Sequence, residues 1–245
     1  MKNNIIVETL FKIRSKNYEK EASWITDENF IRPLRPADFN CGSVLDVCAG
    51  TGTVSKYFNR LGFKVIATDL SQDMMLRIKG GIKCVVADAN SLPFEKNSFD
   101  LVTCRQGLHY LDMGKAFESM NRVADKYITL GHITIHDKED IETWKHYYSI
   151  AVPCRKVVFY PGQIGELGKS HGLTISQSDV VFCKASLDTP IKHLDDKTKK
   201  TLKNILFKTS EIFKKRNGLS FKNGELFSIR RWEFIVFQKN KINGE

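Results

Sequence analysis

The stretch Val44-Leu45-Asp46-Val47-Cys48-Ala49-Gly50-Thr51-Gly52 decides the fold. A short apolar run contains one acidic residue, and small residues with two glycines follow it directly. An apolar run of this length is typical of a buried strand in a parallel sheet. Glycines allow a left-handed backbone and bring N–H groups close to a ligand. Residues 48–52 are therefore predicted to form a nucleotide-type binding loop.

Strand and helix patterns alternate after this loop. Strands are expected at residues 43–47, 63–68, 82–87, 99–104 and 127–134, and helices at residues 54–61, 72–78 and 113–124. Later segments are predicted as helices at residues 142–150, 164–171 and 200–213, an extended segment at 173–187, a connector at 217–225 and a strand at 227–238. Such alternation indicates a parallel sheet with helices on both faces. The expected fold class is α/β, a Rossmann-like, mostly parallel sheet of seven strands.

The chain length suits one α/β domain with attachments better than two independent domains. Helical spacing of Ile6, Leu10 and Ile13 predicts that residues 1–40 begin with a helix and form an N-terminal helical cap. Residues 41–245 are expected to be the main domain, with substrate-side insertions at about residues 142–172 and 188–222. No apolar run reaches the ~20 residues that a membrane span needs, and no signal peptide is recognisable. These features predict a soluble, cytoplasmic protein.

The chain has a net charge of +10 and six cysteines. The cysteines show no paired CxxC spacing, so reduced thiols are expected and a zinc site or disulfide framework is unsupported. His132, His136 and Asp137 lack a recognised ligand spacing, so no catalytic metal is predicted. The basic excess between Lys197 and Arg216 is interpreted as the solvated face of an amphipathic helix rather than a nucleic-acid surface.

Three aspartates lie at or near the ends of successive predicted strands: Asp46, Asp69 and Asp88. An acid about 20 residues after the loop commonly accepts hydrogen bonds from ribose hydroxyls, and Asp69 has this position. A lone aspartate is more often a turn residue or a helix N-cap. Three at successive strand ends indicate a ligand-binding edge of the sheet.

Several segments together resemble the motifs of class I S-adenosylmethionine (SAM)-dependent methyltransferases. They are residues 44–52, 68–71 with Met74, 86–89, 92–94, 98–102 and 108–110. The resemblance covers about residues 43–134 and is closest to the small-molecule branch that includes ubiquinone and menaquinone biosynthesis methyltransferases. It implies an antiparallel last strand. Two departures are Cys48 in place of the family's first glycine and the lack of a Pro-Gly-Gly turn before Tyr127.

The resemblance also assigns cofactor contacts. On the methionine side of SAM it implies Asp46 and the loop residues Cys48, Ala49, Gly50, Thr51 and Gly52. Arg105 and Gln106 would lie near the methionyl group and the substrate entrance.

On the adenosine side, the resemblance implies that Asp69 binds the ribose hydroxyls and that Leu70 lies against the adenine. Asp88 and Ala89 would read the edge of the adenine base. The product would be S-adenosylhomocysteine (SAH).

Methyl transfer from a sulfonium is an in-line displacement, so the protein mainly positions the acceptor and excludes water. A base is needed only for a poorly nucleophilic acceptor. His109 is the best candidate base, and a structural histidine at the strand end is an equally open interpretation. Arg32, Arg35 and Arg155 are candidates for binding a substrate carboxylate or phosphate, although solvent-facing roles are more common.

A SAM-dependent methyltransferase with a small-molecule acceptor is the leading hypothesis. The alternatives are an RNA methyltransferase, a SAM-binding protein without transferase activity, and a nicotinamide oxidoreductase. The acceptor atom stays open among oxygen, nitrogen, carbon and sulfur, and so does the oligomeric state.

Overall fold

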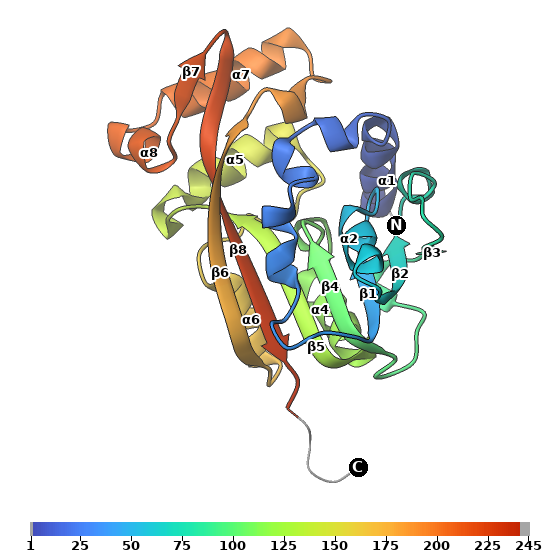
Figure 1. Cartoon of the computed structure of the whole chain (residues 1–245). Helices are drawn as coiled ribbons and strands as arrows, with labels where there is room; N and C mark the ends of the chain where they lie inside the picture. Colours follow the sequence, from blue (N-terminus) through green and yellow to red (C-terminus); the bar gives the residue numbers. More distant parts are fainter. Residues whose placement is uncertain (1, 241–245) are drawn as a thin grey trace.

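The computed structural model describes residues 2–240, with the side chains described from residue 6 onward, and it contains a central sheet flanked by helices (Figure 1). The strands are β1 (Ser43–Val47), β2 (Lys64–Asp69), β3 (Lys83–Val86), β4 (Phe99–Arg105), β5 (Ala124–Thr134), β6 (Thr174–Ser186), β7 (Ser220–Lys222) and β8 (Glu225–Gln238). The helices are α1 (Lys2–Arg14), α2 (Thr53–Arg60), α3 (Gln72–Met75), α4 (Met113–Val123), α5 (Ile141–Ala151), α6 (Gln163–Ser170), α7 (Asp196–Phe207) and α8 (Glu211–Arg216).

The sheet has the order β3-β2-β1-β4-β5-β8-β6. Strands β1 to β5 pair in parallel, and β8 is antiparallel to both β5 and β6. The predicted α/β class, the mostly parallel sheet and the antiparallel last strand are therefore confirmed. Because β1 pairs with β2 on one side and β4 on the other, the strand order reverses at β1, where open α/β sheets bind their ligands.

The prediction of seven strands was wrong by one. The segment predicted as a connector at residues 217–225 contains β7, which pairs with β8 through a tight hairpin. Asn223 and Gly224 form its turn with φ angles of 50° and 80°, as a two-residue hairpin requires. The turn residues were visible in the sequence, but the three-residue strand before them is too short to show a period.

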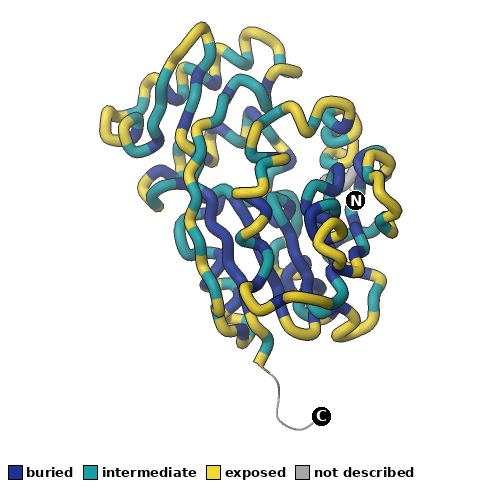
Figure 2. Tube along the Cα trace, viewed as in Figure 1, coloured by how far each residue is buried: buried dark blue, intermediate teal, exposed yellow. Residues whose placement is uncertain are grey.

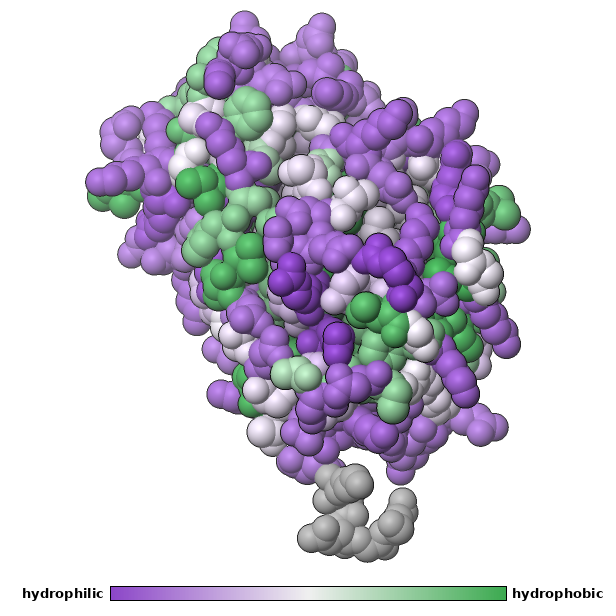
Figure 3. Space-filling view, in the orientation of Figure 1, coloured by the Kyte–Doolittle hydropathy of each residue, from purple (hydrophilic) through white to green (hydrophobic). Residues whose placement is uncertain are grey.

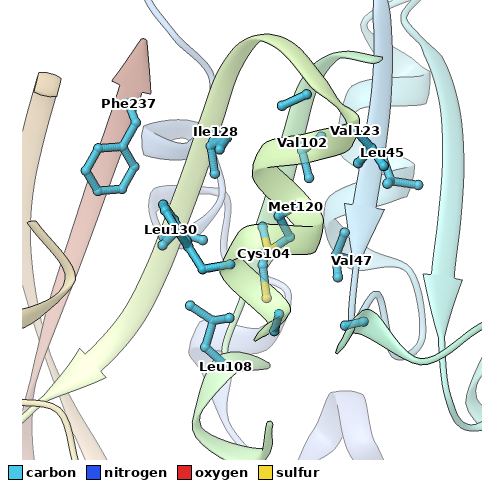
Figure 4. Close-up of a cluster of buried hydrophobic side chains, with 14 of the residues drawn as sticks. Leu45, Val47, Val102, Cys104, Leu108, Met120, Val123, Ile128, Leu130 and Phe237 are labelled. Atoms are coloured by element: carbon cyan, nitrogen blue, oxygen red, sulfur yellow. The ribbon is translucent and has the colours of Figure 1, made fainter. Parts of the chain in front are cut away.

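Alternate residues of the strands pack on opposite faces of the sheet, as the period of two predicts. Leu45 and Val47 face a buried cluster that includes α4, whereas Val44 faces a second cluster that includes Phe58 of α2. Figure 4 shows the first cluster, with Met120 of α4 directed at the sheet residues. The same strands form the dark buried centre of Figure 2.

The predicted single helix at residues 200–213 is wrong, because α7 and α8 are separate. Ser210 begins α8, and its side chain accepts a hydrogen bond from the backbone N–H of Phe213 at 3.1 Å. The break changes the rotational phase of the following residues. Phe213 is consequently buried, while its neighbour Ile212 is 71% exposed.

Between α1 and β1, four short 3-10 turns run from Tyr18 to Leu34. Phe30 and Leu34 of these turns are buried in the same cluster as Trp232 and Phe234 of β8. The N-terminal segment therefore packs on the main sheet, and the proposed division at residue 40 stays a prediction. Among the described residues, no helix combines the length and apolar character required to cross a membrane.

The face shown in Figure 3 is largely hydrophilic. A hydrophobic patch toward its left lies over β6, where Val180 and Phe182 are exposed.

Candidate functional site

A pocket of about 710 Å³, its opening to solvent included, lies at the carboxyl ends of the central parallel strands. Its walls are formed by Val7, Phe11, Tyr18, Val47, Cys48, Gly50, Thr68, Asp69, Leu70, Met74, Ala87, Asp88, Ala89, Arg105, Gln106, Gly107, Tyr110 and Leu111. We call this the first pocket. It lies at the point where the strand order reverses, so the sheet topology itself places it.

The loop after β1 forms one wall of the first pocket. Cys48, Gly50 and Gly52 all have left-handed backbone, with φ angles of 57°, 55° and 77°. A side chain on Gly50 would point toward the Tyr18 ring, since an added Cβ would lie 4.0 Å from that ring. Because glycine has no side chain, the space between the loop and Tyr18 stays open at Gly50.

Asp69 is the last residue of β2, and together with Asp88 it supplies the two carboxylates among the residues that line the first pocket. Its two carboxylate oxygens accept hydrogen bonds from the backbone N–H groups of Gly50, at 2.9 Å, and Ser71, at 2.8 Å. Burial raises the pKa of Asp69, while these backbone donors act to lower it. The two bonds fix the carboxylate at the pocket wall and tie β2 to the glycine loop.

Asp88 lies on the same side, just after β3. Its Oδ1 accepts hydrogen bonds from the backbone N–H of Asn90 at 2.9 Å and from the Asn90 side chain at 2.7 Å. Leu70 and Ala89 complete this part of the wall. Polar acceptors and small apolar residues here suit the ribose and base of a nucleoside.

Asp46 does not line the first pocket. It is 1% exposed, and its Oδ2 accepts a hydrogen bond from the Ser55 hydroxyl at 2.5 Å. Burial raises its pKa to about 7. The residue connects β1 to α2 through this bond, and its predicted contact with a ligand stays a prediction.

Cys48 and Gly107 are packed closely against each other. A Cβ added to Gly107 would lie 2.4 Å from the Cys48 Cβ, so only glycine fits there. A hydrogen bond with Cys104, together with burial, raises the pKa of Cys48 and keeps it a thiol. In this arrangement Cys48 is a packing residue. The sequence did not single out Gly107, because nothing in its local sequence indicates this contact.

Arg105 reaches from the end of β4 into the N-terminal turns. Its guanidinium donates to the carbonyls of Trp24, Ile25 and Phe30 and to the hydroxyl of Thr53, at 2.6 to 3.3 Å. Arg105 therefore lines the first pocket while its charged end holds the N-terminal turns in place.

Gln106 takes a left-handed backbone with φ 61°, and its N–H donates to the Gly131 carbonyl at 2.9 Å. Its side-chain Nε2 is buried without a hydrogen-bond partner among the described residues. A buried amide donor of this kind is available to a ligand.

A second pocket, about 760 Å³ including its opening, adjoins the first. The two share the lining residues Phe11, Tyr18, Gln106 and Tyr110. The remaining walls of the second pocket are Arg14, Glu21, Ala22, Trp24, Ile25, His109, Ile133, Tyr148, Val152, Arg155, Ala185, Ser186, Pro190 and Arg230. Two adjoining spaces of these sizes can hold a cofactor and an acceptor side by side.

His109 lies in the second pocket and is 3% exposed. Burial, with a further contribution from the charge of Arg155, lowers its pKa well below the ordinary value. Its Nδ1 has no hydrogen-bond partner among the described residues. The ring is therefore neutral at pH 7, and its centroid lies 6.2 Å from that of the equally buried His132.

Among the residues that the sequence singled out, the fold brings eight together around the first pocket: Cys48, Gly50, Asp69, Leu70, Asp88, Ala89, Arg105 and Gln106. The predicted loop residues Ala49, Thr51 and Gly52, like Asp46, are outside the lining, and His109 lines the second pocket instead. In the described part of the chain, no group of three or more His, Cys, Asp or Glu side chains is arranged to hold a metal ion.

Comparison with known families finds a match for the part of the chain that forms most of the first pocket. Residues 45–126 match the family described as "Methyltransferase domain". The chain is therefore similar to methyltransferase domains over these residues, which are called the methyltransferase domain below. The match contains the loop after β1, Asp69, Asp88 and the end of β4, which together supply most of the first pocket.

Curated relatives of the methyltransferase domain are similar over the same part. One is a demethylmenaquinone methyltransferase of Renibacterium salmoninarum, 43% identical over 84 residues, which are 33% of this chain and 35% of the relative. Another is the ubiquinone/menaquinone biosynthesis C-methyltransferase UbiE of Escherichia coli, 35% identical over 94 residues, covering 33% and 38% of the two chains. This chain thus spans little more than a third of the length of these relatives.

Among solved structures, the YcgJ protein of Bacillus subtilis is similar, with a TM-score of 0.74 and 19% identity over 82% of this chain and 93% of that one. This likeness shows the fold. Outside the methyltransferase domain, both pockets draw on segments that the family match does not reach, including Phe11, Tyr18, Arg155 and Arg230. Arg155 was named from the sequence as a candidate for binding a substrate carboxylate or phosphate, and it lines the second pocket. Phe11, Tyr18 and Arg230 had no motif by which the sequence could identify them.

Proposed function

We propose that the chain is a SAM-dependent methyltransferase that acts on a small molecule. The observation that carries the proposal is the first pocket, where the glycine loop, Asp69 and Asp88 meet at the switch point of a methyltransferase domain. The relatives whose names refer to methyl transfer on menaquinone and ubiquinone precursors support a small-molecule acceptor.

The residues present fit SAM. The open space at Gly50 and the unpartnered amide of Gln106 would receive the methionine end, and the fixed carboxylate of Asp69 would accept hydrogen bonds from the ribose hydroxyls. Leu70, Asp88 and Ala89 would enclose the adenine. When bound, SAM supplies the electrophilic methyl group.

The second pocket would hold the acceptor. It joins the first at Gln106 and Tyr110, so an acceptor there would lie next to the methionine end of the first pocket. Phe11, Tyr18 and Tyr110 enclose the junction and would exclude water from it. Neutral His109 would accept a proton where the acceptor must lose one, and its low pKa makes it a weak base.

The basic C-terminal segment gives no particular support to an RNA substrate. Lys199, Lys203, Lys214 and Arg216 each form an ion pair with a nearby acid. These residues belong to α7 and α8, whose buried side chains form a cluster with α5 rather than lining either pocket. The cytoplasmic location expected from the sequence stays a prediction.

Transfer of a tritiated methyl group from SAM tests the activity. The protein is incubated with labelled SAM and either the low-molecular-mass fraction of a cell extract or purified total RNA, with heat-inactivated protein as control. We expect label in a new small-molecule species and none in RNA. Label in acid-precipitable RNA would favour the RNA alternative, and SAM binding without label in any fraction would favour a binding protein.

A further inference from the structure

The second pocket contains two arginines, Arg155 and Arg230, that form no ion pair with an acid among the described residues. We propose that they form a binding site for an oxyanion group, a carboxylate or a phosphate, carried by the methyl acceptor. The inference rests on the proposed function and narrows its acceptor from any small molecule to an anionic one.

The hydrogen bonds of the two guanidinium groups leave most of their donors available. Arg155 donates from Nε to the Val157 carbonyl at 2.9 Å, and Arg230 donates from one terminal nitrogen to the Tyr148 hydroxyl at 3.0 Å. A guanidinium has five N–H donors, so four remain on each side chain. Neither arginine lies within ion-pair distance of a carboxylate in the part of the chain that the structure describes.

Aromatic faces position both groups. The Arg155 guanidinium carbon lies 4.2 Å from the centroid of the Tyr148 ring, and that of Arg230 lies 5.5 Å from the centroid of a Trp144 ring. Such contacts hold a guanidinium plane in place but contribute only about 0.5–2 kcal/mol, and they bring no negative charge. The two cations are therefore oriented and still uncompensated.

The charges around the second pocket are unbalanced. Its lining contains three arginines and a single carboxylate, that of Glu21. Glu21 is already bonded to Arg14, which neutralises that arginine and leaves Arg155 and Arg230 as net positive charge. A charge removed from water without a partner is costly, so an entering oxyanion would find strong complementary donors.

Neighbouring titratable groups respond to this positive charge. Arg230 and Arg155 lower the pKa of Tyr148 although burial acts in the opposite direction. Arg155 also contributes to the lowered pKa values of His109 and His132. The positive field thus reaches across the pocket to the candidate base, where a bound anion would weaken it.

The other lining residues of the second pocket indicate the chemistry of the remaining part of the acceptor, apart from its anionic group. Phe11, Ile25, Val152 and Pro190 supply apolar surface between the arginines and the junction with the first pocket. An acceptor with an apolar or planar body and an anionic end would match both parts. The oxyanion would orient the molecule while its nucleophilic atom faces the first pocket.

Calorimetric titration with matched probes tests the site. Benzoate and phenyl phosphate are compared with the neutral benzyl alcohol, each titrated into the full chain in the presence and absence of SAH and in low-chloride buffer. We expect at least one anion to bind 10-fold or more tightly than the alcohol, since a charged hydrogen bond contributes about 1.5–3 kcal/mol. The stronger of the two anions identifies the carboxylate or the phosphate as the preferred group.

Variants assign the binding to these side chains. Arg155→Gln and Arg230→Gln should each weaken the preferred anion about 10-fold or more. Arg155→Lys, which keeps the charge and loses the planar fork, should give an intermediate loss. Arg60→Gln, which alters an exposed arginine that is paired with Glu28 and lines neither pocket, should leave anion binding unchanged.

Unchanged SAH affinity in each variant establishes that its fold is intact. The proposal is overturned if the alcohol binds as tightly as the anions, if neither anion saturates the protein up to about 10 mM, or if intact glutamine variants bind anions normally. Failure of SAH to bind the unmodified protein would instead contradict the proposed function. The anion titrations made without SAH would still test the anion site in that case, so the two failures can be told apart.

Discussion

At the scale of single residues, Asp46 and Asp69 show how one residue type takes different roles in neighbouring positions. Both were singled out by their places at strand ends. Asp69 turns toward the first pocket and accepts two backbone hydrogen bonds, whereas Asp46 turns inward to Ser55. Strand position could be predicted from the sequence, but the direction of each side chain depends on packing between β1 and α2.

The buried carboxyl of Asp46 should make stability depend on pH. Its folded-state pKa of about 7 lies above the ordinary 3.8, so folding favours the protonated form. This contribution is complete below about pH 4 and is lost as the pH rises to about 7. Asp46→Asn, which resembles the protonated acid, should therefore be more stable than the unmodified protein at pH 8, by a free energy of unfolding on the order of 4 kcal/mol. At pH 4 the two proteins should unfold at similar urea concentrations. A constant difference at both pH values would contradict the assignment.

Asp69 should matter for ligand affinity. Asp69→Ala removes the acceptor proposed for the ribose hydroxyls and the partner of the Gly50 N–H, so we expect SAM binding to weaken by 10-fold or more. Asp196→Asn, at a fully exposed carboxylate on α7, is the matched control and should bind SAM normally. Calorimetry measures both, and equal affinities would show that Asp69 does not contact the cofactor.

The contact between Cys48 and Gly107 should appear as an energetic coupling. Gly107→Ala places a methyl group against the Cys48 Cβ and should lower the free energy of unfolding by about 1–3 kcal/mol. Cys48→Gly removes that neighbour, so the alanine should cost markedly less in the double variant. Urea unfolding of the four proteins measures the coupling, and additive effects would mean that the two positions do not clash.

At the scale of elements, the strands were the most predictable part of the fold. The strand predicted at residues 43–47 coincides with β1, since a buried apolar run bounded by glycines has few alternatives. The boundary between α7 and α8 was not predictable from periodicity, because a break of three residues leaves a nearly continuous apolar pattern. Ser210 was the available signal, as a residue that caps helices.

The cap of α8 provides a test at this scale. Ser210→Ala removes the acceptor for the Phe213 N–H and should lower the free energy of unfolding by about 1 kcal/mol. Ser210→Asp, which retains a capping acceptor, should keep stability near that of the unmodified protein. A destabilised aspartate variant with a normal alanine variant would contradict the capping role.

At the scale of the whole molecule, the two pockets differ in how far the sequence could predict them. The first is built largely from consecutive strand ends of the methyltransferase domain, so eight of its residues could be named in advance. The second combines α1, the N-terminal turns, the segment after α5 and β8. Figure 1 shows α5 beside the upper half of β8, and α1 above the upper ends of β1 and β2. Arg155 and Arg230 meet there only through the tertiary fold.

The central claim is that the first pocket of this chain binds SAM. Calorimetric titration of the unmodified protein with SAM, SAH and NAD tests it most directly. We expect saturable binding of SAM and SAH at one site per chain and no competition by NAD. Tight binding of NAD with no response to SAM or SAH would contradict it.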